Sequence, residues 1–271
     1  MIDVHTHLHP PRLFAAIRRW FAERSPWVLD HPSEPSEVAR ELFAGGVEEF
    51  AFCSYAHKPG MARDLNVWLA QTARDLGPRA HALCTVHLDD ASALDDARAA
   101  LDDGCIGMKV HEDVQQLRID DPRFAPILAL LAQREAFVLV HAGPIPWKND
   151  TNEAPRRIAS VLDRHPELRI TVAHLGTPDT RAYFALAARY PNLFTDTTMA
   201  LVNDAMRLPL DPAEFEAAHG MILYGSDFPN IPYPYARERE SIEALGLSAP
   251  ARRAIFRENA LRLSPAFGGT R

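Results

Sequence analysis

The chain has 271 residues, 47% of them hydrophobic and 24% charged, which is ordinary for a globular protein with one large core. Its net charge of −7 gives no electrostatic reason to expect a nucleic-acid partner. The start of the chain lacks a secretory signal and no run approaches about 18 consecutive apolar residues, so we expect a cytoplasmic protein with no membrane partner.

Eight short apolar or β-branched runs recur along the chain, each with the length of a strand. We expect strands at 2–7, 48–54, 80–87, 104–111, 136–141, 169–174, 193–197 and 221–227. Helices are predicted at 37–44, 63–76, 91–101, 124–133, 153–163, 180–189, 212–218 and 249–263. Such alternation builds parallel sheets, and eight units predict an α/β fold, a (β/α)8 TIM barrel in which residues 1–271 form a single domain. A doubly wound open sheet is the alternative.

The connection after the first strand is longer than a normal strand-to-helix loop. It covers residues 10–35, and its stretch 12–24 has a helical pattern with Trp20, Phe21 and Trp27 in or near it. We interpret the segment as an insertion near the barrel mouth, a candidate lid. An additional packing helix is the alternative.

The three cysteines lie in or beside apolar runs and show no CxxC spacing. They are Cys53, Cys84 and Cys105. We expect reduced, buried thiols, which agrees with a cytoplasmic protein.

Histidines fall at the ends of the predicted strands. His5 and His7 are two residues apart on the first strand and therefore share a face, while His141, His174 and Asp227 end the fifth, sixth and eighth strands. The carboxyl ends of barrel strands line the functional site. Imidazole nitrogens and a carboxylate suit a divalent transition metal, with zinc expected first and manganese, iron or cobalt as alternatives. Each residue alone would be an ordinary polar strand end.

The fourth strand carries Lys109 and His111 on one face. A lysine inside a barrel must be neutralised, paired or modified, because burying its charge is costly. Carbamylation would turn it into a carboxylate that bridges two metal ions. Alternatively, Lys109 pairs with Asp227 or binds an anionic substrate. His111 is a candidate substrate ligand or proton shuttle, or it bonds a loop.

Other residues that follow strand ends are candidates for substrate contacts. They are Tyr55, His57, His87, Trp147, Asn203 and Asn230, of which we favour His87 and Trp147, together with His111, as substrate-binding residues. Residues of these types after a strand are more often loop or packing residues than specificity contacts.

With these residues in place, the sequence resembles the amidohydrolase superfamily, in particular its "amidohydrolase 2" branch. The resemblance runs from His5 to the segment 259–263. It implies that His5, His7 and Asp227 ligate a metal and that His141 is a further ligand. His174 would bind a second metal or, in a one-metal site, polarise the substrate, and Lys109 matches the position that is carbamylated in two-metal members. Branch members are often dimeric, which suggests a homodimer.

The ligand set predicts a reaction in which the metal activates water. A bound metal lowers the pKa of water toward neutrality, and Asp227 can accept its proton while His174 polarises the carbonyl. We therefore expect a metal-dependent hydrolase that cleaves an amide, ester or lactone bond of a small molecule.

Two other functions stay open. One is a lyase on the same metal site, either a non-oxidative decarboxylase or a hydratase. The other is a non-catalytic metal-binding barrel. Aromatic-acid decarboxylases of the branch often carry Glu in place of the first histidine, so His5 argues against decarboxylation without excluding it.

Overall fold

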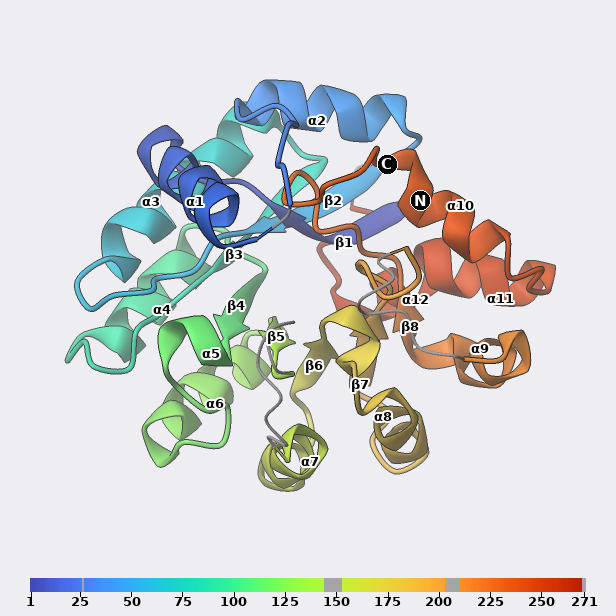
Figure 1. Ribbon diagram of the computed structural model, residues 1–271. Helices are drawn as coiled ribbons and strands as arrows, with labels where there is room; N and C mark the ends of the chain where they lie inside the picture. The colour runs from blue at the N-terminus through green and yellow to red at the C-terminus, as the bar shows by residue number, and fades with distance from the viewer. Residues whose placement is uncertain (26, 144–152, 203–209, 270–271) are drawn as a thin grey trace.

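The computed structural model describes residues 1–25, 27–143, 153–202 and 210–269. Eight parallel strands follow one another around a sheet in the order β1 to β8, and helices surround them (Figure 1). The strands are β1 Ile2–His7, β2 Glu49–Cys53, β3 Ala80–Cys84, β4 Gly107–His111, β5 Phe137–His141, β6 Arg169–Val172, β7 Leu193–Asp196 and β8 Ile222–Leu223. The predicted (β/α)8 barrel and its single domain are confirmed.

The ring is closed by backbone hydrogen bonds between β1 and the residues that follow β8. Val4 N–H donates to Tyr224 O at 3.0 Å, and His7 N–H donates to Phe228 O at 2.8 Å. In return, the Asp227 N–H donates to His5 O at 2.8 Å. An open sheet would leave these edge groups unpaired, so the alternative of a doubly wound sheet is wrong.

The helices lie on the outside of the strands. They are α1 Pro11–Arg24, α2 Pro35–Ala44, α3 Ala62–Leu76, α4 Ala93–Asp102, α5 Glu112–Gln115, α6 Ala125–Gln133, α7 Ala154–Arg164, α8 Thr180–Ala187, α9 Pro212–Ala218, α10 Ala236–Glu243, α11 Ala249–Arg253 and α12 Asn259–Leu263. A π-helical segment, Ala254–Glu258, joins the last two. Within the described ranges, no helix is both long and apolar enough to span a bilayer.

The core has two parts because buried strands are apolar on both faces. In β5, Phe137 and Leu139 belong to a cluster inside the barrel, while Val138 and Val140 pack with the surrounding helices. The same alternation brings His141, two residues after Leu139, to the inner face at the end of the strand. The strand pattern therefore positions polar side chains above an apolar barrel floor.

Several strands end earlier than the sequence predicts, and in two of them the difference concerns a candidate site residue. β6 stops at Val172 and β8 at Leu223, whereas we expected them to reach His174 and Asp227. Both residues have left-handed backbone conformations, with φ of 58° and 62°, which cannot continue an extended strand. Their side chains consequently enter the barrel mouth from turns, and left-handed residues other than glycine are often found at functional sites.

Candidate metal centre

Four side chains from two strands and one turn converge at the carboxyl end of the barrel. Asp227 Oδ1 lies 2.9 Å from His7 Nε2 and 3.2 Å from His5 Nε2, and Lys109 Nζ lies 2.8 Å from the same His5 nitrogen. Zinc bonds of about 2.1 Å in a tetrahedral site place the donor atoms about 3.4 Å apart. The two imidazole nitrogens and the carboxylate oxygen therefore fit a divalent metal ion.

The second nitrogen of His5 is held by a buried carboxylate. His5 Nδ1 donates to Asp196 Oδ2 at 2.9 Å, while Asp196 Oδ1 accepts from the backbone N–H groups of His174 and Thr198. Burial raises the pKa of Asp196, but His5, His174 and Thr198 outweigh it and lower the pKa to about 2. Burial and the Lys109 charge lower the pKa of His5 to about 4. His5 is thus neutral at pH 7, and the proton on Nδ1 leaves a lone pair on Nε2 for a metal.

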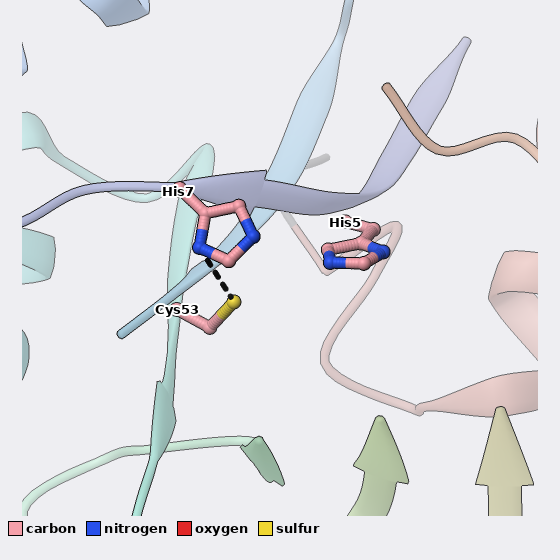
Figure 2. Close-up of side chains that lie close together, drawn as sticks. All are labelled: His5, His7 and Cys53. Carbon is pink, nitrogen blue, oxygen red and sulfur yellow. Dashed lines mark hydrogen bonds between the residues drawn. The ribbon is translucent and has the colours of Figure 1, made fainter. Parts of the chain in front are cut away.

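A thiol holds the second nitrogen of His7. Cys53 Sγ donates to Thr6 O at 3.3 Å. It also lies 3.5 Å from His7 Nδ1, and Figure 2 marks this contact with a dashed line. Potential ligand atoms of His5, His7 and Cys53 lie within 4.8 Å of one another. However, Cys53 faces the ring nitrogen opposite to the one that faces Asp227. We therefore assign the thiol to orienting His7 rather than to the ligand set that contains Asp227.

Three further imidazoles lie on the other side of His5. His174 Nδ1 donates to Thr198 O at 3.0 Å, and its Nε2 lies 3.1 Å from His141 Nδ1. The ring of His141 stacks on that of His111, with centroids 4.0 Å apart. Burial, reinforced by neighbouring cations and imidazoles, holds the pKa of both His111 and His141 well below the usual value. Both rings are therefore neutral, and His111 Nδ1 has no hydrogen-bond partner among the described residues.

A cavity of about 440 Å³ opens onto this cluster. Its polar lining includes Lys109, Asp227 and the imidazoles of His7, His111, His141 and His174. Its apolar lining includes Tyr55 and, from the segment that we interpreted as an insertion, Trp20, Phe21 and Trp27. The cavity thus joins a polar floor to an aromatic wall, the usual composition of a small-molecule site.

The structure brings the six predicted metal-site residues into one cluster: His5, His7, Lys109, His141, His174 and Asp227. Of the predicted substrate contacts, His111 lines the cavity, whereas His87 is not among the described lining residues and accepts from the Asp89 N–H at 3.3 Å. Trp147 and Asn203 lie outside the described residues. The individual roles stay predictions.

Sequence reasoning missed Asp196, Thr198 and Cys53, which hold the ring nitrogens of the cluster. Asp196 is the last residue of β7, so the strand-end rule that selected His141 also applied to it. Cys53 likewise ends β2. Its apolar neighbours in the sequence suggested a packing role and gave no sign of the contact with His7. Thr198 lies in a turn and offered no comparable signal.

Comparisons with known proteins agree with this architecture. A family model described as Amidohydrolase matches residues 2–264. A curated relative from Aspergillus aculeatus, named 6-methylsalicylic acid decarboxylase, is 26% identical, and the match covers 97% of this chain and 96% of the relative. A solved TIM-barrel protein from Bordetella bronchiseptica, uncharacterised in function, has a TM-score of 0.74 at 21% identity, with 97% of this chain and 98% of the other covered. A 5-carboxyvanillate decarboxylase from Novosphingobium aromaticivorans, complexed with manganese and 4-hydroxy-3-methoxy-5-nitrobenzoic acid, has a TM-score of 0.72 at 16% identity, with 97% and 95% covered.

These names contradict the expected reaction. We expected a hydrolase that cleaves an amide, ester or lactone bond, but the full-length curated relatives are named decarboxylases. The expectation of hydrolysis is therefore wrong. A histidine at position 5 does not argue against decarboxylation. Replacing a carboxylate ligand by an imidazole changes the charge of a metal site without fixing which bond is broken.

Proposed function

This chain belongs to the amidohydrolase family, and we propose that it is a metal-dependent, non-oxidative decarboxylase of a small aromatic carboxylic acid. The observation that carries the proposal is the near-complete match to a curated relative named 6-methylsalicylic acid decarboxylase. The geometry supports it, because a lysine and a histidine cluster lie below an aromatic-lined cavity. Such a site offers opposite charge to a carboxylate and a flat apolar surface to a ring.

We propose that His5, His7 and Asp227 hold one divalent ion, with His141 as a further ligand. When bound, the ion would act as a Lewis acid that holds and polarises oxygen atoms of the acid. Zinc suits the imidazole-rich donor set, and manganese has precedent in the manganese-complexed neighbour. The alternative is two ions per chain with a carbamylated Lys109, which native mass spectrometry of the purified protein at neutral pH would reveal.

The reaction replaces a carboxylate by a proton. The bond between the ring carbon and the carboxylate breaks, its electron pair stays on the ring carbon, a proton forms the new C–H bond, and CO2 leaves. We propose that Lys109 Nζ, buried at the cavity floor, pairs with the carboxylate and aligns it. His174, whose Nδ1 is committed to Thr198 O, presents Nε2 to the reacting groups.

Asp227 is our candidate for the residue that delivers the proton. Its side chain is 14% exposed and lines the cavity. Burial alone would raise the pKa of Asp227, but the charge and hydrogen bond of His7 hold it well below the usual value. When the carboxyl group takes up a proton from solvent, it can pass that proton to the weakly basic ring carbon.

The test is product analysis in D2O with the metal-loaded protein. We would supply 6-methylsalicylate and 2,6-dihydroxybenzoate, acids named for relatives and neighbours, and measure CO2 and the ring product. We expect equimolar CO2 and one solvent deuteron on the vacated ring carbon, with the activity lost in a chelator. Lys109→Met should lose at least about 100-fold in kcat/KM, whereas Lys58→Met, which alters an exposed lysine, should not. Binding of these acids without any CO2 release would contradict the proposal.

A further inference from the structure

The turn after β7, residues 197–199, touches two imidazoles of the centre. Thr198 O accepts from His174 Nδ1 at 3.0 Å, and Thr198 Oγ1 lies 3.2 Å from His5 Nδ1. The next residue, Met199, lines the cavity and has a left-handed φ of 57°. This turn, which we call the β7 turn, therefore orients the centre and shapes the cavity, but a left-handed non-glycine residue needs an external restraint.

That restraint comes from α10, outside the strands (Figure 1). Glu238 is fully buried, and its Oε1 accepts from the Met199 N–H at 3.1 Å and from the Tyr233 hydroxyl. Tyr233 in turn accepts at its carbonyl from His31 Nε2 at 2.9 Å, in the segment that follows α1. One carboxyl group thus ties together the β7 turn, the loop after β8 and the loop after α1.

We propose that Glu238 is a positioning residue: by holding the Met199 amide it fixes the β7 turn, and through Thr198 it fixes the orientation of His174 and His5. Among the described residues, no hydrogen bond joins Glu238 to the reacting groups, so it acts only through the turn. The kinetic part of this inference rests on the proposed decarboxylase function. The structural part, the orientation of His174, does not.

Glu238 performs this task as a neutral acid. Its Oε2 is buried and has no hydrogen-bond partner in the described part of the chain, which disfavours a charge there. Burial raises the pKa of Glu238 to about 8 against the hydrogen bonds from Tyr233 and Met199, and the carboxylates of Asp227 and Asp3 add to the rise. The phenols of Tyr224 and Tyr233 also face it. Above about pH 8 an unpaired carboxylate would form beside two others and loosen the turn.

Three variants separate positioning from general stabilisation. Glu238→Gln keeps the oxygen that accepts from Met199 and stays neutral, whereas Glu238→Leu removes the acceptor. Glu240→Gln changes an exposed glutamate on the same helix and serves as the matched control. With 15N-histidine labelling of the metal-free protein, long-range 1H–15N spectra report the His174 tautomer. We expect the Nδ1–H form in the wild type, in Glu238→Gln and in Glu240→Gln, and a mixture in Glu238→Leu.

The kinetic readout uses the metal-loaded protein. Glu238→Leu should lose about 10-fold to 100-fold in kcat/KM at pH 7, and the two glutamine variants should stay within about twofold. The wild type should lose activity above about pH 8, while Glu238→Gln should keep it. Unchanged His174 spectra in Glu238→Leu, or the same alkaline loss in Glu238→Gln, would overturn the inference. If Glu238→Leu does not fold, the comparison of Glu238→Gln with the wild type across pH still decides. If no variant releases CO2, the proposed function fails and the His174 spectra decide this inference alone.

Discussion

Replacing Asp196 by Asn should weaken metal binding without removing a metal ligand. Asp196 accepts three hydrogen bonds, from His5 Nδ1 at 2.9 Å and from the backbone N–H groups of His174 and Thr198 at 3.0 and 3.2 Å. An asparagine has only one acceptor oxygen. If that oxygen stays with the two backbone groups, its NH2 faces His5 Nδ1, and two donors meet. His5 must then move its proton to Nε2, the nitrogen that we propose for the metal.

The magnitude follows from two independent quantities. Loss of a group that fixes the tautomer of a metal-binding histidine typically costs 10-fold to 100-fold in affinity, so we expect a fall of about that size. The pKa of Asp196 is lowered from 3.8 to about 2, a shift of about two units or about 2–3 kcal/mol of folding stability. Because the folded-state pKa is depressed, this stability is present above pH 4, is lost as the pH falls toward 2, and is lost at neutral pH in the variant.

The assay is competition for zinc against a chromophoric chelator at pH 7, with urea unfolding of the metal-free protein measured in parallel. The matched control is Asp102→Asn, in which the carboxylate is 54% exposed and pairs with Arg134 at the surface. We expect the control to match the wild type in both measurements. Wild-type zinc affinity in Asp196→Asn would refute the tautomer argument, even if the variant were less stable.

Three other outcomes are expected. The raised pKa keeps Glu238 protonated in the folded state, while the unfolded state ionises above pH 4.5. The contribution of Glu238 to wild-type stability therefore falls as the pH rises from 4.5 to 8. In urea unfolding, Glu238→Gln should gain about 2–3 kcal/mol relative to the wild type between pH 5 and pH 7. Trp20→Ala should raise KM for an aromatic acid about 10-fold with little change in kcat, because Trp20 lines the cavity wall, whereas Arg12→Ala on the exposed face of α1 should not. Zinc at 100 times its Kd should stabilise the folded protein by about 3 kcal/mol, and a thermal melt that is insensitive to zinc would contradict a preformed site.

The sequence predicted the elements whose signal is local. β1 spans the predicted residues, Ile2–His7, and α3 differs by a single residue from the prediction because a glycine with a left-handed backbone follows Leu76. By contrast, α10 was missed. Five of the eight residues in its sequence, ARERESIE, are charged, and the only residues that it buries are Glu238 and Ile242. A helix that packs through a protonated glutamate has no apolar stripe in its sequence. The burial of Glu238 therefore could not be predicted from the sequence, and neither could the helix that carries it.

The candidate site divides in the same way. The histidine spacing predicted the side chains that converge, because strand ends of a parallel barrel always meet at one edge. What holds those side chains was not predictable, since Asp196, Thr198 and Glu238 act through hydrogen bonds between elements far apart in sequence. Left-handed turns at His174 and Asp227 also depend on tertiary contacts. The His174 N–H donates to Asp196 Oδ1, and the Asp227 N–H donates to His5 O.

The expectation of hydrolysis is wrong for a physical reason that applies to other metal sites of this kind. Two imidazoles and a carboxylate specify a Lewis acid, and a Lewis acid polarises the oxygen of a water molecule or of a substrate carboxylate equally well. The bond that breaks is decided by the groups that line the cavity around the metal site. Here these are Lys109, buried at 1% exposure beside the proposed ligand His5, and an aromatic wall that includes residues of α1. Ligand motifs therefore predict a metal site, whereas the reaction depends on the other residues that line the cavity, which only the fold brings together.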